Sequence, residues 1–392
     1  MLANRWTMLG MLFLVRTSMG FQFQSIASVS PFLIEDMAIG YTEIGTLIGL
    51  FMLPGVVIAL PGGLLGKRFG DKRICVSGLA LMVVGGVLVG ASQSYAIAFA
   101  GRLLSGIGAV LFNVVLTKMV ADWFAGKEIV TGFGVMLGAW PFGIALGLVS
   151  QSILAETYSW QIVMYLTAGV CAVGLGVVMT LYHAPRSWDH SSLAETPTHF
   201  RIPIQELIPV SMAGLAWGAF NVGLVIFFSF TPALLTTQGW SAVDAGSLVS
   251  LGLWVSILSL PLGGYLTERI GFTNAMMLVF SLVTGAALFL LPYLPFPIGL
   301  SILVGLSIGP PAGALVALPT QALSAENRGP GLGIFYSWYY LAMAAGPVIA
   351  GLGRDLSGSA AIPVLFGGAM FVATTFFIGM FHLSRSKMAA VN

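Results

Sequence analysis

The chain has 392 residues, of which 57% are hydrophobic and only 8% are charged, and its mean hydropathy is +0.96. Soluble globular proteins carry about 25% charged residues, so this composition excludes a soluble domain. It predicts an all-α membrane protein embedded in the lipid bilayer. The net charge of +2 gives no reason to expect a nucleic acid as a partner.

Hydrophobic runs bounded by charge, glycine or proline recur along the chain with short connections. We expect six helices near residues 6–32, 43–65, 73–93, 96–120, 129–153 and 159–182. Six more are expected near residues 206–235, 243–266, 273–293, 296–321, 329–352 and 361–383. The sequence therefore predicts twelve transmembrane helices, in two six-helix bundles (1–182 and 206–392) that a polar linker (183–205) joins.

The loop lysines and arginines predict the orientation. With the N-terminus inside, nearly all of them lie on the cytoplasmic side and only Arg354 lies outside. We expect a monomer in the cell (inner or plasma) membrane, with both termini and the linker in the cytoplasm. The first apolar segment is too long for a signal peptide and lacks a small-residue cleavage site, so we expect it to remain as an anchor.

Little in the sequence indicates enzyme chemistry. The sequence contains neither a phosphate-binding loop nor histidines and cysteines at metal-ligand spacing. Cys75 and Cys171 lie within predicted helices, where we expect buried small side chains. Three of the four histidines fall in the polar linker. We therefore expect no metal, no cofactor, no enzymatic activity and no transport driven directly by ATP.

Two arginines, Arg16 and Arg102, are the basic residues that this topology places inside the membrane. A charge there costs about 2.5–3.5 kcal/mol on insertion scales and needs a partner. All 14 acidic residues fall in loops or at helix ends, so no carboxylate balances them. A small anionic substrate is the simplest missing counter-ion. Alternatively, amide and backbone oxygens satisfy both arginines, or Arg102 extends to the nearby outer surface.

The two halves of the chain are related by an internal repeat. An offset of 201 residues aligns Gly62–Gly70 with Gly263–Gly271, and it also aligns Ser30-Pro31 with Thr231-Pro232. One offset that serves several helices indicates duplicated halves. Parallel repeats with a substrate site between them are one architecture of secondary transporters.

Three segments carry a resemblance to a known family. Residues Gly63–Lys72 resemble the loop signature between helices two and three of the major facilitator superfamily, and Gly264–Gly271 resemble its echo after helix eight. Gly101–Gly108 resemble the arginine motif in helix four of that superfamily. This resemblance covers nearly the whole chain and implies the fold of the family.

The resemblance also implies a latch that closes the cytoplasmic side. Its residues here are Gly63, Lys67, Arg68, Gly70, Asp71, Gly264, Glu268, Arg269 and Gly271. The family normally has an acid where this chain has Lys67, while Glu268 fills the equivalent place in the second half. Asp71, one turn onward, is a candidate substitute for the missing acid. The alternative reading of the basic cluster is a topology signal alone.

In the family, helices one, four, seven and ten line the central cavity, so the resemblance implies that Arg16 and Arg102 face one space. Helical spacing places Asn113 on the face of Arg102. The 201-residue offset puts Trp217 where the first half has Arg16, which leaves one cationic and one aromatic side. The predicted substrate-binding residues are Arg16, Arg102, Asn113, Gly20, Phe23, Trp217, Asn221, Tyr336 and Tyr340.

The expected function is transport of a small organic or inorganic anion by alternating access. Because no carboxylate or histidine lies in midmembrane to carry a proton, we favour uniport or anion exchange, with proton symport possible if the substrate brings the proton. Arg16 with Ser28–Leu33 and Phe112–Leu116 also resembles the cyanate-porter branch. Two alternatives remain, namely efflux of drugs or apolar compounds, hinted at by Pro141-Phe142-Gly143, and a non-transporting receptor on the same fold.

Overall fold

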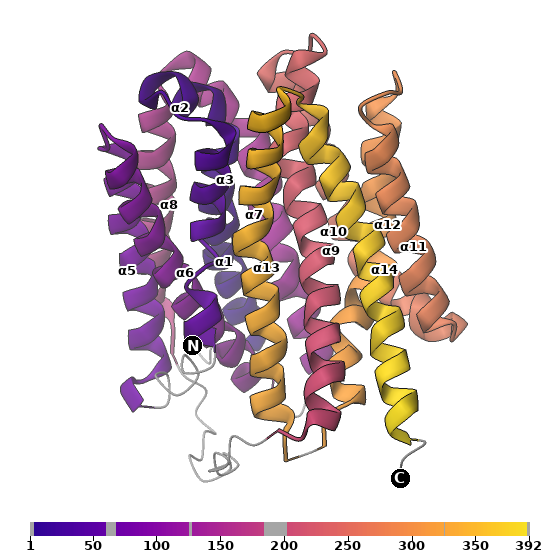
Figure 1. Ribbon diagram of the computed structural model, residues 1–392. Helices are drawn as coiled ribbons and strands as arrows, with labels where there is room; N and C mark the ends of the chain where they lie inside the picture. The colour runs from indigo at the N-terminus through magenta and orange to yellow at the C-terminus, as the bar shows by residue number, and fades with distance from the viewer. Residues whose placement is uncertain (1–3, 60–67, 125–127, 184–201, 325, 390–392) are drawn as a thin grey trace.

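The computed structural model describes residues 4–59, 68–124, 128–183, 202–324 and 326–389 (Figure 1). These residues are helical apart from turns and short connections. The first half contains α1 (Arg5–Ser28), α2 (Ser30–Met37), α3 (Tyr41–Leu50), α5 (Asp71–Gly90), α6 (Tyr95–Trp123), α7 (Ile129–Thr157) and α8 (Trp160–Leu181). The second contains α9 (Ile204–Thr237), α10 (Ala242–Ile270), α11 (Thr273–Leu290), α12 (Pro297–Ala317), the 3-10 turn η2 (Leu318–Gln321), α13 (Arg328–Ser357) and α14 (Ala361–Ala389).

The prediction of an all-α, multi-pass membrane protein is confirmed. In the parts of the chain that the structure describes, eleven helices are long and apolar enough to cross a membrane. Helix α1 has 24 residues and the length to do so, but its buried polar residues lower its hydropathy. The boundary of the linker at residues 183–205 falls mostly outside the described residues, so the limits of the two bundles stay a prediction.

Prolines divide the first two predicted helices. The segment expected as one helix over 6–32 is split at Val29 into α1 and α2, with Pro31 in the first turn of α2. Helix α3 passes through turns at 51–54 before the chain becomes helical again at 55–59, and Pro54 lies in that break. Both breaks follow from the missing N–H of proline and from the crowding of its ring against the preceding turn.

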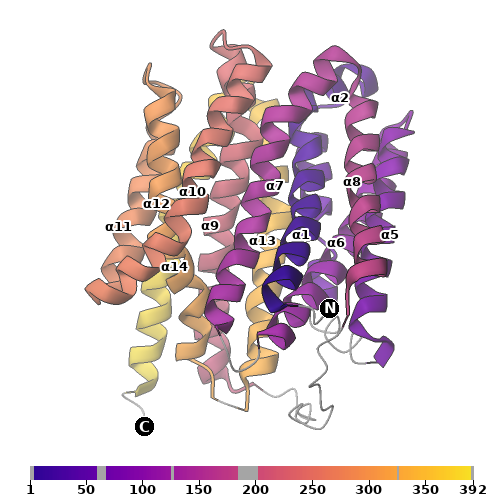
Figure 2. The ribbon, with the colours of Figure 1, turned by 180° about the vertical axis from the view of Figure 1, so that it is seen from behind.

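The helices stand side by side, and both ends of the chain lie on one face (Figures 1 and 2). We call this the termini face, and the opposite one, which carries the turns at 38–40 and 358–360, the far face. Within the halves, α1 packs on α7 and α8, and α9 packs on α13 and α14. Between the halves, α3 packs on α13 and α7 on α10. The 201-residue offset relates α3 to α10 and α7 to α13, so these two interfaces are equivalent by the repeat.

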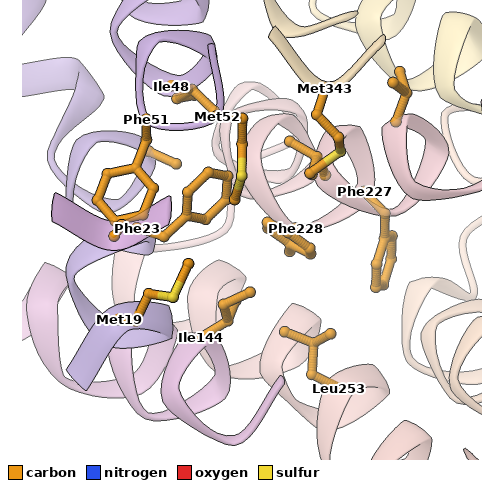
Figure 3. Packing of buried hydrophobic residues seen from close by; sticks show 14 of the residues in the cluster. Met19, Phe23, Ile48, Phe51, Met52, Ile144, Phe227, Phe228, Leu253 and Met343 are labelled. Atoms are coloured by element: carbon orange, nitrogen blue, oxygen red, sulfur yellow. The ribbon is translucent and has the colours of Figure 1, made fainter. Parts of the chain in front are cut away.

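A cluster of apolar side chains fills the space between the halves (Figure 3). Phe23 of α1 lies against Phe51, with ring centroids 5.5 Å apart, and against Phe228 of α9 at 6.2 Å. Met52, which follows α3, and Met343 of α13 belong to the same cluster. Burial of these apolar side chains contributes to holding the two halves together.

Candidate functional site

Arg16 lies near the middle of α1 and is only 7% exposed. Its Nη1 donates a hydrogen bond to the carbonyl oxygen of Met136 in α7 at 2.7 Å, while its Nε is buried and has no partner. The ion pairs within the described residues are Arg5 with Glu128 and Lys118 with Asp71, so no described carboxylate pairs with Arg16. Its guanidinium therefore keeps an unused donor in the membrane interior.

Tyrosines of the other half lie near Arg16. The side chains of Tyr336, Tyr339 and Tyr340 in α13 lie close enough to interact electrostatically with it. These three positions share one side of the helix, because residues three and four apart are neighbours on its surface. The ring centroids of Tyr339 and Tyr340 are 5.0 Å apart, and Trp217 of α9 stacks on Tyr339 at 6.2 Å.

Asn113 of α6 joins this group through Tyr340. The Asn113 side chain lies close enough to the Tyr340 hydroxyl to interact with it, so residues of both halves meet at this place. The Oδ1 atom of Asn113 is buried and has no partner. The ring of Tyr340 also packs on Gly55, where a Cβ would lie 2.6 Å or less from three ring atoms. We call Arg16, Asn113, Tyr336, Tyr339, Tyr340 and Trp217 the Arg16 cluster.

Arg102 has a different environment from the one expected. Its Nε donates to the carbonyl of Leu47 at 2.9 Å, its Nη1 to that of Gln22 at 3.0 Å and its Nη2 to that of Phe23 at 2.7 Å. Its guanidinium carbon lies 4.5 Å from the Phe51 ring centroid, and the residue is 2% exposed. These contacts match the alternative of satisfaction by backbone oxygens and do not support a ligand shared by Arg16 and Arg102.

Three other residues of the predicted site have contacts within the protein itself. A Cβ on Gly20 would lie 2.5 Å from the Trp140 carbonyl oxygen, so Gly20 permits close contact between α1 and α7. Phe23 belongs to the apolar cluster between the halves and also lies 5.1 Å from the Trp140 ring. Asn221 donates to the carbonyl of Trp217 on its own helix at 2.8 Å.

The described residues of the predicted latch lie near the termini face. Gly63 and Lys67, and the side chain of Glu268, lie outside the described residues. Arg68 is exposed and Arg269 donates to the Tyr265 hydroxyl one turn away, at 3.0 Å. The latch therefore stays a prediction.

Two glycines of the repeated loop have a clear structural role. Gly70 precedes α5 with φ 88° and Gly271 ends α10 with φ 76°, a conformation that glycine adopts without strain. A Cβ on Gly264 would meet nothing within 4 Å.

Asp71, the candidate substitute acid, pairs within its own half. Its Oδ2 accepts a hydrogen bond from Lys118 Nζ at 2.7 Å. Lys72 beside it donates to the carbonyl oxygen of Tyr182 at 2.9 Å. Burial, together with the carboxylates of Asp122 and Asp71, raises the pKa of Tyr182, so its hydroxyl stays protonated near this pair. In this conformation these contacts join α5, α6 and the end of α8, and none of them crosses between the halves.

Sequence reasoning missed two members of the site environment. Tyr339 follows Tyr336 by three residues in the run Tyr336-Ser337-Trp338-Tyr339-Tyr340, and helical spacing alone places it beside Arg16's other tyrosines. Met136 contributes a backbone oxygen, for which a sequence carries no signal. No group of three or more metal-ligating side chains occurs in the parts of the chain that the structure describes.

Comparisons with known proteins bear on the family. A family model described as Major Facilitator Superfamily matches residues 12–347 and 211–392. The quinolone resistance protein NorA of Staphylococcus aureus (strain MRSA252) is 23% identical over 211 residues, which are 54% of this chain and 49% of that protein. The methylenomycin A resistance protein of Bacillus subtilis (strain 168) is 31% identical over 126 residues, which are 32% of this chain and 27% of that protein. The chain spans between 25% and 49% of the length of the curated relatives it matches.

A solved structure supports the same fold. The crystal structure of the nucleoside transporter NupG, in a mutant form, superposes with a TM-score of 0.73 and covers 95% of this chain and 100% of that chain. The sequence identity is 14%, so this likeness shows the fold alone. The resemblance to the cyanate-porter branch is not tested by these comparisons and stays a prediction.

Proposed function

Since this chain belongs to the Major Facilitator Superfamily and is therefore a multi-pass membrane transporter, not an enzyme, we propose that it carries a small organic anion bound at Arg16 between its halves. One observation carries the proposal. Arg16 is a buried guanidinium with an unpartnered Nε and no described carboxylate partner, and it lies among groups from both halves. An anion would supply the missing acceptor.

The surroundings of Arg16 favour an organic anion over a bare inorganic ion. Three tyrosine rings and Trp217 offer apolar faces, while the hydroxyls and Asn113 Oδ1 offer polar contacts. Such a site has the composition of a small-molecule pocket, mostly apolar with a few convergent polar groups. Arg102 is left out of the proposal because its Nε, Nη1 and Nη2 already donate to backbone carbonyls.

Alternating access follows from the position of the Arg16 cluster between the halves. Contacts between the halves run from the far face, where Gly351 of α13 lies against the backbone of Tyr41, to Tyr340, whose ring packs on Gly55. We propose that these contacts close the far side of the site. Anion binding would neutralise Arg16 and lower the cost of enclosing its charge, which couples the substrate to the movement. We propose uniport or exchange by a monomer in the cell membrane, with both termini in the cytoplasm and the far face outside.

Uptake by purified protein in proteoliposomes tests the assignment. Arg16→Gln keeps a polar side chain but removes the charge, so anion uptake should fall at least tenfold, the effect of losing about 1.4 kcal/mol of binding. Arg5→Gln is the matched control, because Arg5 lies on the same helix in a partly exposed ion pair with Glu128. Unchanged anion uptake by a folded Arg16→Gln protein would show that the anion binds elsewhere.

Export of organic compounds is the second candidate function. The relatives named for quinolone and methylenomycin A resistance favour it, as do the aromatic side chains around Arg16. Cells that express the protein would then resist such compounds. Resistance to neutral or cationic compounds that persists in Arg16→Gln would favour this candidate over the anion carrier.

A further inference from the structure

The N-terminus of α3 lies against the last turn of α13, and these helices belong to different halves. The carboxylate of Asp355 accepts hydrogen bonds from the backbone N–H of Tyr41 at 2.9 Å and of Thr42 at 2.7 Å. It also accepts one from the Thr42 hydroxyl at 2.6 Å. We propose that Asp355 acts as a second latch, separate from the predicted latch at the termini face. It holds the far face closed by capping α3 from the opposite half.

The local sequence explains why α3 takes its cap from elsewhere. The first N–H groups of a helix have no acceptor within the helix, and an oxygen of the N-cap side chain usually supplies one. The N-cap of α3 is Gly40, which has no side chain, and its own N–H donates to Glu43 Oε2 at 2.9 Å. A Cβ at Gly40 would lie 2.9 Å from Asp355 Oδ2, so glycine also leaves room for the incoming carboxylate.

The charge of the carboxylate suits this position. The N-terminus of a helix carries a partial positive charge that favours an anion. Asp355 is exposed, so solvent weakens the interaction and keeps the latch reversible, as a moving transporter requires.

The internal repeat gives a comparison within the same molecule. Ser241 stands where the first half has Gly40, and it caps α10 itself by accepting a hydrogen bond from Asp244 N at 3.0 Å. The position equivalent to Asp355 is Leu154 in α7. The α7–α10 interface therefore has a helix that caps itself and no carboxylate at this place. At the α3–α13 interface the N-cap residue Gly40 has no side chain, and Asp355 of the other half supplies the cap.

Neighbouring contacts support the same joint. The guanidinium carbon of Arg354 lies 3.5 Å from the Tyr41 ring centroid, which adds a cation–π contact across the halves. A Cβ on Gly351 would collide with the Tyr41 carbonyl oxygen, so the backbones touch there. Arg354, the basic residue that the topology puts outside, thus contributes to the joint at the far face.

Distance measurements between spin labels on the far face test the latch. Tyr158 and Tyr293 are 70% and 69% exposed and follow α7 and α11 on that face, one in each half. Spin labels on Tyr158→Cys and Tyr293→Cys would report the distance between the two halves at the far face. The native Cys75 and Cys171 are buried, so the labels go to the two introduced cysteines. The latch rests on the proposed movement of the halves but not on the anion. The measurement needs no substrate, so its failure leaves the Arg16 assignment to be judged by uptake.

We expect Asp355→Ala to raise about fivefold the ratio of molecules with a long label distance to molecules with a short one. This is the effect expected for losing one helix cap. Asp355→Asn, which loses one acceptor oxygen, should give a smaller rise. Asp244→Ala, an acid on the same face whose contacts are within its own helix end, should leave the ratio as in the parent protein.

A double variant separates the latch from mere stabilisation of α3. Gly40→Asp/Asp355→Ala gives α3 its own cap, because Gly40 has the extended backbone of an N-cap, while the link between the halves stays lost. We expect the double variant to remain open. Distances like those of the parent protein in Asp355→Ala, or a return to them in the double variant, would overturn the proposal.

Discussion

Arg102 ties three helices together, because one side chain in α6 donates to carbonyls of α1 and of α3. Replacing it with leucine removes three hydrogen bonds from a charged donor, each worth about 1.5 kcal/mol or more. We expect Arg102→Leu to lower the thermal unfolding temperature of the purified protein by several degrees or to prevent folding. Arg5→Leu is the control and should change it little. An Arg102→Leu protein as stable as the parent would contradict the structural role.

Tyr340 touches both the site and the opposite half. Its hydroxyl lies near Asn113 and Arg16, while its ring packs on Gly55. Tyr340→Phe keeps the ring and loses the hydroxyl, so we expect KM for the anion to rise about fivefold, as for one lost hydrogen bond of ~1 kcal/mol. Thermal stability should change little. Uptake kinetics beside Tyr293→Phe, a change on the exposed far face, would check this, and an unchanged KM would remove Tyr340 from the site.

For single residues, the sequence shows which side chains are costly to bury in a membrane but not which hydrogen-bond partners they find. Arg16 and Arg102 look alike in sequence, since each is an arginine in an apolar helix with no acid nearby. Only the packing of α1 against α3 and α6 brings three carbonyls to Arg102 and leaves Arg16 with one. The contacts of Asp355 with Thr42 join residues 313 apart, for which local patterns carry no signal.

Among the elements, α3 and α13 approach each other through small residues. A Cβ at Gly45 would collide with the Pro347 carbonyl, and one at Gly49 with the Ala344 carbonyl, so these glycines, four residues apart, face α13. Gly49→Val should force the helices apart, lower uptake at least tenfold and lengthen the far-face label distances. Gly10→Val is the control, because a Cβ at Gly10 meets nothing within 4 Å. Parent-like uptake and distances in Gly49→Val would contradict this packing role.

The elements themselves were largely predictable. Long apolar runs separated by charges and turns predicted the helices, since a span needs about 20 apolar residues. The break between α1 and α2 was missed although Pro31 marks it, because hydropathy continues across Val29 and proline is also tolerated inside membrane helices. Pro141, Pro232 and Pro347 do lie inside α7, α9 and α13. A proline alone therefore does not decide between a kink and an end.

For the whole molecule, the internal repeat relates two interfaces that differ in chemistry. Both α3–α13 and α7–α10 join the halves, but Asp355 and Arg354 serve the first alone. The Arg16 cluster is likewise one-sided, with the guanidinium from the first half and aromatic side chains from the second. The duplication was visible in the 201-residue offset, and the proposed site and the proposed Asp355 latch both lie where the two copies differ.

The central claim is that Arg16 binds the transported anion. The most direct test is a thermal-shift screen of small organic anions, with their neutral amides as matched probes, on purified parent protein, Arg16→Gln and Arg5→Gln. A ligand that binds the folded state raises its stability by mass action, by about 2.7 kcal/mol at a hundred times its Kd. We predict that at least one anion, but not its amide, stabilises the parent and Arg5→Gln and has no effect on Arg16→Gln. Stabilisation by an anion that persists in Arg16→Gln, or none by any anion, would contradict the claim.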